Sequence, residues 1–379
     1  MSIFLLYILA FIFCFCIIWF SIPKILLWAI TKRLIDKPNK RKIHTEIASR
    51  LGGLSFFPAI FLSLTLCAII ASFSPEKINV SLTFSKGILS FKFLSLSAAF
   101  FLIYIIGVKD DIKGMRYKKK LFYQTIATIL IIVSGTWIHN LCGVFGVFEI
   151  PAYIGIPLTV LFMVFIINAI NLIDGLDGLS SGISIIITVI FIVLFYIFNR
   201  QSELILASAL LGMLISFFRY NLFGVDNNKY KIFMGDAGSL LIGIILSYFA
   251  ISGSQLGINS SILPVEETFI ISASALLVPC LDVLNVMCHR IKNGKSIFNP
   301  DKSHIHHKLM AAGFSQRKTL ITILIIVIFF LLLNRLLYNF MNINTILFID
   351  VVIYITLQIL ITKKIKFASQ KLKPSKPKA

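Results

Sequence analysis

Charged residues are scarce in this sequence: Asp, Glu, Lys and Arg supply only 14% of its 379 residues, whereas 58% of the residues are hydrophobic. Soluble domains carry about 25% charged residues, so this composition excludes a soluble fold. Cysteine is scarce too, because the chain has six cysteines, no Cys-x-x-Cys pair, and most of them in apolar segments. They are predicted to be small buried hydrophobic residues, and neither a zinc site nor a disulfide framework.

No polar segment is long enough to form a soluble domain. Apolar runs of about 17–25 residues, the length that a membrane-spanning helix needs, recur along the whole chain. The first run lacks a preceding charged region and is too long for a signal-peptide core, so we expect it to remain as a membrane span. The fold class is therefore all-α and polytopic, with one integral-membrane domain over residues 1–362 and a basic tail over 363–379. About eleven spans are predicted, at roughly 3–23, 51–73, 90–108, 121–141, 154–172, 183–198, 204–223, 237–255, 267–288, 319–339 and 346–362.

Acidic residues are outnumbered, with 16 Asp and Glu against 36 Lys and Arg, which gives a formal net charge of +20. Basic residues concentrate in the loops on the cytoplasmic side of membrane proteins. Here 31 of the 36 lie in alternate loops and the tail, namely 24–50, 109–120, 219–231, 290–318 and 363–379. This bias predicts an outside N-terminus and a cytoplasmic C-terminus. The charge then indicates attraction to anionic lipid headgroups and substrates, not to nucleic acid.

The stretch NAINLIDGLDGLSSG, residues 168–182, lies between two apolar runs. On a helix, the three-residue spacing of Asp174 and Asp177 places both carboxylates on one face, and Asn168 and Asn171 repeat the spacing earlier. Ionisable groups at the edge of a membrane core are costly, which indicates a functional site. The alternative is a polar turn between helices with a capping aspartate.

Two further aspartate motifs belong to the predicted cytoplasmic side. Asp110 and Asp111 are adjacent, and they repel each other unless a cation or one of the following lysines compensates them. Asp236 lies in KIFMGDAGS at the expected start of a helix. It suits either a plain helix cap or a seat for magnesium and phosphate. Together these motifs indicate a site for a metal and phosphates.

Three histidines, at positions 304, 306 and 307, lie in one basic loop. Zinc is one alternative, which the absence of cysteine from the loop and the oxygen ligands elsewhere disfavour. Neutral imidazoles can instead form hydrogen bonds with a sugar or a phosphate. A solvated basic loop without a ligand is the remaining alternative.

In this combination and order, the Asp110–Asp111 pair, NAINLIDGLDGL, FMGDAGS and HIHH resemble the motifs of the polyprenyl-phosphate N-acetylhexosamine-1-phosphate transferases of the glycosyltransferase family 4 type. The resemblance covers about residues 30–318. FNPD before HIHH resembles the bacterial branch that transfers N-acetylglucosamine phosphate to undecaprenyl phosphate. Members of this family begin O-antigen (lipopolysaccharide), enterobacterial common antigen, teichoic acid or capsule chains.

The resemblance implies roles for particular residues. Asp236 and Asn171 would bind Mg²⁺, or Mn²⁺ in its place. The catalytic carboxylates would be Asp110, Asp111, Asp174 and Asp177, the first two at the lipid phosphate and the last two around the nucleotide and metal. The substrate-binding residues would be Lys120 on the diphosphate, Asn168, and His304, His306 and His307 at the sugar phosphate.

The implied activity is that of a phosphotransferase in the bacterial inner membrane with a cytoplasmic active site. Its substrates would be a UDP-N-acetylhexosamine and undecaprenyl phosphate, with UMP released, and the chain could act as a homodimer. One alternative is the same chemistry with another UDP-sugar. A lipid transporter or flippase is the alternative from another class, and it would need charges at mid-bilayer and internal repeats, which the sequence does not show.

Overall fold

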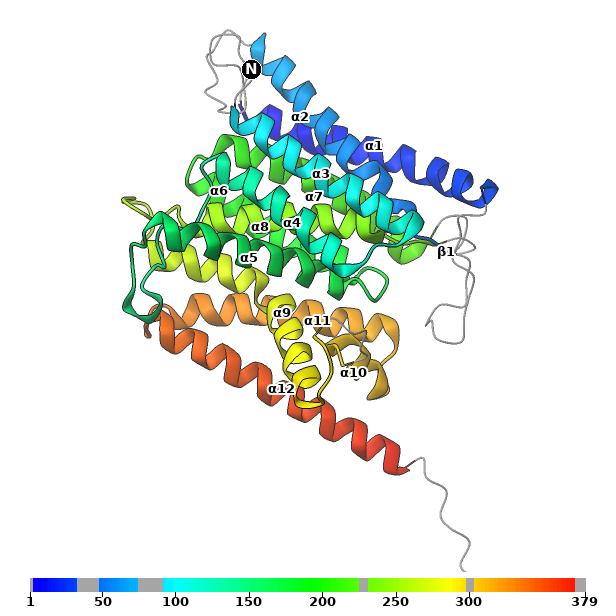
Figure 1. Cartoon of the computed structure of the whole chain (residues 1–379), viewed down its shortest axis with the longest axis vertical. Coiled ribbons are helices and arrows are strands. Elements are labelled where there is room, and N and C mark those ends of the chain that lie inside the picture. Colours follow the sequence, from blue (N-terminus) through cyan, green and yellow to red (C-terminus); the bar gives the residue numbers. More distant parts are fainter. Residues whose placement is uncertain (1–2, 33–47, 74–90, 225–230, 298–302, 372–379) are drawn as a thin grey trace, which may run out of the picture.

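The computed structural model describes residues 3–32, 48–73, 91–224, 231–297 and 303–371, and it is almost entirely helical (Figure 1). Its helices and strands, in chain order, are α1 (Ile3–Thr31), β1 (Ala48–Ser49), η1 (Leu51–Ser55), α2 (Phe56–Ser72), α3 (Phe91–Lys113), α4 (Tyr117–Val133), η2 (Val144–Gly146), α5 (Ala152–Ile173), α6 (Leu179–Ile197), α7 (Gln201–Phe223), β2 (Lys231–Ile232), α8 (Gly235–Ser254), α9 (Val265–Lys292), α10 (Ile305–Ala311), α11 (Gln316–Leu337) and α12 (Ile343–Lys371).

Ten of the described helices are long and apolar enough to cross a membrane. Each of the eleven predicted spans corresponds to a long helix. The helix that is not among these ten is α4, which has only 17 residues. The predicted end of that span, 141, is wrong, because α4 stops at Val133 before Gly135, whose φ of +93° does not continue a helix. The predicted ends of the first and last spans, 23 and 362, are also wrong, since α1 continues to Thr31 and α12 continues to Lys371. The remaining tail residues, 372–379, lie outside the described residues.

Helix α8 is the centre of the bundle, and almost all of its side chains are buried against α3, α5, α6 and α9. Small residues bring its backbone close to its neighbours. A Cβ on Gly243 would lie 2.8 Å from the Cα of Ile167 in α5, and one on Gly107 of α3 would lie 2.4 Å from the Cα of Ala237. Such contacts are typical of helices packed within a membrane. They bring the C-terminal ends of α3 and α5 to the N-terminal end of α8.

A short parallel ladder fixes the segment that leads into α8. Ala48 pairs with Lys231 and Ser49 with Ile232. The two glycines that follow continue the attachment, because Gly53 donates its backbone N–H to the carbonyl of Met234 at 2.9 Å. A Cβ on Gly53 would lie 2.2 Å from the backbone nitrogen of Gly238, so this position requires glycine.

Charged residues of the predicted outer and inner segments lie at opposite ends of the bundle. Lys92 at the start of α3 forms an ion pair with Glu203 at 2.8 Å, and Arg335 forms one with Glu267 at 3.1 Å, all in segments predicted to face outside. Asp110 is 18 residues further along α3 than Lys92, about 27 Å along the helix axis. The predicted inner and outer segments therefore lie at different ends of the molecule.

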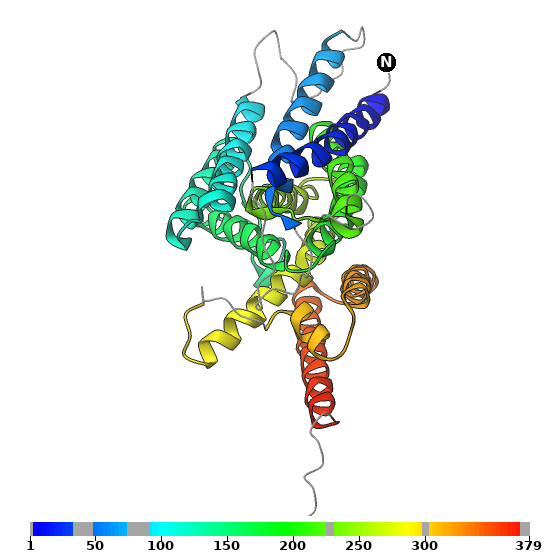
Figure 2. The same ribbon diagram turned by 90° about the vertical axis from the view of Figure 1, so that its right-hand side faces the viewer.

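Helices α9, α11 and α12 form a second part of the molecule. The C-terminal half of α9 and the whole of α12 project away from the bundle of α1–α8 (Figure 2). The six cysteines form no disulfide. The prediction that they are buried is wrong for Cys288, which is exposed on α9.

Candidate active site

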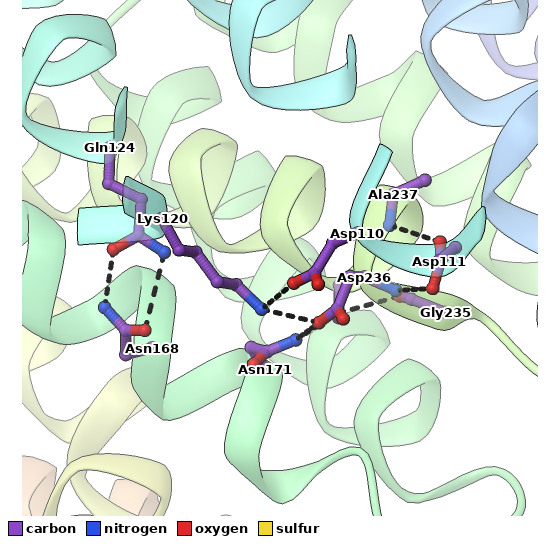
Figure 3. A network of polar contacts seen from close by, with 10 residues as sticks. Asp110, Asp111, Lys120, Gln124, Asn168, Asn171, Gly235, Asp236 and Ala237 are labelled. Carbon is purple, nitrogen blue, oxygen red and sulfur yellow. Dashed lines mark hydrogen bonds and ion pairs between the residues drawn. The ribbon is translucent and has the colours of Figure 1, made fainter. Parts of the chain in front are cut away.

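Four helix ends, those of α3, α4, α5 and α8, meet around the ammonium group of Lys120 (Figure 3). Lys120 lies in the first turn of α4. Its Nζ lies 2.8 Å from Oδ1 of Asp236 and 3.1 Å from Oδ2 of Asp110. Asn171, near the end of α5, donates its amide N–H to the same Oδ1 of Asp236 at 2.5 Å and to Ser239 Oγ at 2.8 Å. Three of the predicted functional groups, Lys120, Asn171 and Asp236, are thus in direct contact, and Asp110 joins them.

Asp111 has a different position from its neighbour Asp110. Its Oδ1 accepts the backbone N–H of Asp236 at 2.8 Å, and its Oδ2 accepts that of Ala237 at 2.9 Å. The N-cap residue of α8, Met234, provides no capping side chain, so the carboxylate from α3 takes that role. A negative group is also stabilised at the positive end of a helix. Asp111 therefore holds in place the first turn of α8, which carries Asp236.

Gly235 makes this arrangement sterically feasible. Its φ is +69°, and a Cβ would lie 2.1 Å from the backbone oxygen of Arg50 and 2.6 Å from Oδ2 of Asp111. Both the backbone conformation and the close approach exclude a side chain here.

Replacing Gly235 with alanine is therefore expected to lower turnover by about tenfold or more, because Asp236 must move with the displaced helix end. Gly294→Ala is the matched control, since Gly294 has a similar φ of +64° but no atom within 4 Å of the added Cβ. Rates per folded molecule are to be compared in membranes. Equal rates for the two variants would contradict the expectation.

The loop after α5 carries two further carboxylates, Asp174 and Asp177. Asp177 forms an ion pair with Lys231 of β2 at 2.9 Å and is buried. Asp174 receives no hydrogen bond at its side chain from the residues that the structure describes. Burial, and then the nearby charges of Asp236, Asp177 and Asp111, raise the pKa of Asp174 to about 7. A carboxyl group in such surroundings is a natural ligand for a cation.

Asn168 has a partner of its own, one turn before Asn171. Its amide N–H donates to Oε1 of Gln124 at 2.8 Å, and Gln124 donates back at 3.4 Å. This pair joins α4 to α5 beside Lys120 (Figure 3). The structure thus gives Asn168 a contact between helices, and its predicted role in substrate binding stays a prediction.

Helix α10 brings the histidines close to the loop between α5 and α6, residues 174–178, which is called the carboxylate loop below because it carries Asp174 and Asp177. His306 is buried, and its Nε2 would lie 2.5 Å from a Cβ on Gly175, which separates Asp174 from Leu176. Neither ring nitrogen of His306 has a hydrogen-bond partner among the described residues. Burial, with the neighbouring His307 and His304, lowers its pKa to about 3, so the ring is neutral. A buried polar group without a partner is unusual and fits a ligand-binding position.

The other two histidines flank His306. The ring centroid of His307 lies 4.2 Å from that of His306. His304 is the N-cap residue of α10, and its Nδ1 lies 2.8 Å from Oδ2 of Asp282 in α9. The structure therefore brings all four sequence motifs together at one end of the bundle.

The residues present fit a magnesium ion. Among the residues that the structure describes, no three His, Cys, Asp or Glu side chains are placed to form a complete metal cage. Mg²⁺, however, is usually bound by one or two carboxylates together with substrate phosphates and water. Asp236 and Asn171 supply hard oxygen donors of this kind. Asp174 lies close enough to Asp236 for the charge of Asp236 to contribute to its raised pKa.

Sequence reasoning gave no role to Asp282, the partner of His304. A signal was present, because an ionisable residue within an apolar span is a functional candidate by default. Gln124 and Ser239 were missed for another reason, since neutral polar residues at helix ends are common and carry no distinctive pattern.

Comparisons with known proteins agree with this site. The sequence profile described as glycosyl transferase family 4 matches residues 93–254, which contain the three aspartate motifs. Several relatives are called undecaprenyl-phosphate alpha-N-acetylglucosaminyl 1-phosphate transferase. The one from Yersinia pestis is 30% identical over 297 residues, which are 78% of this chain and 74% of the relative.

Two further relatives of the same name match to a similar extent. The protein from Escherichia coli (strain K12) is 30% identical over 293 residues, 76% of this chain and 72% of the relative. The protein from Pasteurella multocida (strain Pm70) is 32% identical over 292 residues, 76% of this chain and 75% of the relative. With the same motifs assembled into one site, the chain belongs to the polyprenyl-phosphate N-acetylhexosamine-1-phosphate transferase family, and it is a membrane enzyme that transfers a sugar 1-phosphate.

Proposed function

We propose that the chain transfers N-acetylglucosamine 1-phosphate from UDP-N-acetylglucosamine to undecaprenyl phosphate, and so begins a cell-envelope polysaccharide. The relatives' names supply the acceptor and the sugar. The observation that carries the proposal is the contact of Lys120 with Asp110 and Asp236 at the ends of membrane-spanning helices. There a lipid-linked phosphate can enter from the bilayer while a nucleotide sugar enters from the aqueous side.

The reaction needs placement and charge compensation more than proton removal. A phosphate monoester has a second pKa near 6, so the lipid phosphate is largely dianionic at neutral pH. Its oxygen attacks the β-phosphorus of the nucleotide sugar, a P–O bond forms there, and the bond from that phosphorus to the bridging oxygen breaks. UMP leaves with that oxygen. Lys120 stabilises the charge that develops on the phosphates.

Each remaining group of the site has a defined task in this proposal. Asp111 keeps the first turn of α8 in position, and Asn171 orients Asp236 through its amide N–H. Asp236 and the amide oxygen of Asn171 would hold Mg²⁺, or Mn²⁺, which supplies charge neutralisation on the phosphate oxygens. Asp110 competes with the substrate phosphates for Lys120, so substrate binding requires that this ion pair rearrange.

The direct test is UMP release by the purified protein in the presence of UDP-N-acetylglucosamine, undecaprenyl phosphate and Mg²⁺. UMP and the lipid-diphosphate sugar should form in equal amounts, and neither should form without the lipid acceptor. A flippase would instead move a labelled lipid between leaflets without releasing UMP. Homodimer formation belongs to the same proposal, and the mass of the detergent-solubilised protein checks it.

The proposed location of the site is the cytoplasmic face of the bacterial inner membrane. The support is the distribution of the basic residues along the sequence, since 31 of the 36 lie in the segments predicted to face inside or in the tail. A reporter that is active only outside the inner membrane should therefore be silent when fused to the C-terminus. The same reporter inserted at Glu149 is the positive control, because this exposed residue lies in a segment predicted to face outside. A C-terminal signal would reverse the assignment.

The histidines make the proposed sugar testable. The imidazole rings of His304 and His307 carry groups that form hydrogen bonds, and a site built on such bonds rejects analogues that leave them unpaired. UDP-N-acetylglucosamine should be preferred over UDP-N-acetylmuramoyl-pentapeptide in direct competition, with a UDP-N-acetylfucosamine-type sugar as the second choice. His304→Ala and His307→Ala should reduce the rate or the selectivity. Preference for the pentapeptide substrate, or full rate and unchanged selectivity in both variants, would contradict the expectation.

A further inference from the structure

A chain of mostly buried hydrogen bonds connects His304 to the C-terminal helix α12. Tyr354 and Gln358 are one turn apart on α12, and both are buried although the helix projects from the bundle. The Tyr354 hydroxyl donates to Oδ1 of Asp282 at 3.2 Å. Asp282 is also the residue whose Oδ2 lies 2.8 Å from Nδ1 of His304. A third donor, the backbone N–H of Ile305, reaches Oδ1 of Asp282 at 2.8 Å.

The chain of hydrogen bonds continues from α12 to a lysine of α10. Lys308 Nζ donates to Oε1 of Gln358 at 2.7 Å, and Gln358 donates through Nε2 to the Tyr354 hydroxyl oxygen at 2.9 Å. Lys308 is four residues after His304. The chain of hydrogen bonds therefore begins at the N-cap residue of α10 and ends within the same helix. Five side chains from α9, α10 and α12 form this chain of hydrogen bonds, which is called the circuit below.

The direction of every hydrogen bond in the circuit follows from its chemistry. An ammonium group can only donate, so Gln358 must present its oxygen to Lys308 and its NH₂ to Tyr354. The Tyr354 oxygen then accepts, and its proton points to Asp282. A carboxylate that already accepts from Tyr354 and Ile305 is an acceptor for His304 as well. Nδ1 of His304 must therefore carry a proton, and in the neutral form of the ring Nε2 is then the acceptor.

We propose that Asp282, Tyr354 and Gln358 are positioning residues, which hold His304 in one orientation and in the Nδ1–H tautomer for its contact with the nucleotide sugar. The ring of His304 stacks on that of His306, with centroids 5.7 Å apart, and His306 contacts Gly175 in the carboxylate loop. The C-terminal helix is thereby linked to the donor site through side chains in direct contact. The kinetic part of this inference rests on the proposed function.

The tautomer is tested without any activity measurement. The protein labelled with ¹⁵N-histidine should show His304 with a protonated Nδ1 and an unprotonated Nε2, assigned by comparison with His304→Gln. Gln358→Glu retains the side-chain size but offers only acceptors to Lys308 and Tyr354, which turns the tyrosine proton away from Asp282. This variant should change the His304 signals, whereas Gln358→Met should change them less. An Nε2–H tautomer in the unaltered protein would overturn the proposal.

Kinetics then test the effect on the donor site. Tyr354→Phe removes one hydroxyl and should raise KM for the nucleotide sugar by about tenfold, with KM for the lipid acceptor unchanged. Thr356→Val is the matched control, because it removes a hydroxyl from the exposed face of the same helix, where it bonds only to the carbonyl of Val352. A loosened helix without a positioning role would lower kcat and leave both KM values unchanged.

The outcomes for the two proposals are distinguishable. If the unaltered protein releases no UMP, the proposed function fails, and the tautomer of His304 still decides whether the circuit acts as inferred. If UMP is released and Tyr354→Phe leaves the donor KM at the unaltered value, or Thr356→Val raises it equally, the positioning role is refuted.

Discussion

Asp236→Ala should reduce the rate of sugar-phosphate transfer by at least about a thousandfold, because several kcal/mol of charge stabilisation depend on this carboxylate. Its Oδ1 is shared by Lys120 at 2.8 Å and by Asn171 at 2.5 Å. Removal of Asp236 therefore leaves the lysine paired with Asp110 alone, and it leaves the Asn171 amide with Ser239 Oγ in place of its two acceptors. The variant loses the proposed magnesium ligand and the alignment of the lysine together.

The measurement is UMP release at saturating concentrations of both substrates, normalised to folded protein in membranes. Glu149→Ala is the control for removal of a carboxylate, because Glu149 is exposed and lies in a predicted outer segment. It should retain the unaltered rate. Excess chelator should abolish turnover of the unaltered protein, and Mg²⁺ should restore it. Retained activity in Asp236→Ala, or in excess chelator, would eliminate Asp236 and the metal from the reaction.

The membrane helices were predictable because the bilayer imposes their length and composition. The sequence patterns located all eleven long helices. They placed three ends wrongly, those of α1, α4 and α12. Ser134 and Gly135 follow Val133, and the left-handed backbone of Gly135 ends α4 before apolar residues resume at Trp137. Polar residues after 362 do not stop α12, since lysines are good helix formers.

The partners within the site could not be predicted in the same way. Lys120 and Asp236 are 116 residues apart in the chain, and their contact depends on how α3 and α5, the helices that α4 packs against, pack on α8. The circuit around Asp282 likewise joins residues up to 72 positions apart. Motif spacing identified the residue types that the chemistry needs, whereas the packing of α3, α5 and α8 decides which of them touch.

Asp110 and Asp111 show this difference most clearly, because adjacent residues on a helix point about 100° apart. Asp110 faces Lys120, and Asp111 faces the backbone of α8. The sequence indicated a pair acting on one phosphate, and it contained no signal for two separate tasks. Mutagenesis can distinguish the tasks by their dependence on pH.

Asp110→Asn should lower turnover by about 10²–10⁴-fold below pH 6, where the lipid phosphate keeps its second proton and a general base is needed. The residual rate should rise with pH, because the lipid phosphate loses its second proton near pH 6 and then needs no base. Asp111→Asn should lower turnover by about a hundredfold, as expected for misplaced catalytic groups, and by the same factor at every pH. Its new NH₂ group would face a backbone N–H of α8, so the helix end carrying Asp236 must shift.

The two variants are controls for each other, since each replaces one carboxylate by an amide of the same shape. Asp111→Asn should also lower the thermal stability, because a buried backbone donor that loses its acceptor costs about 1–3 kcal/mol. Asp110→Asn should lower stability less, because its oxygen pairs with a lysine that keeps Asp236 as a partner. Identical pH profiles and identical melting temperatures in the two variants would mean that the neighbours share one role, and that the contact of Asp111 with α8 has no consequence for catalysis.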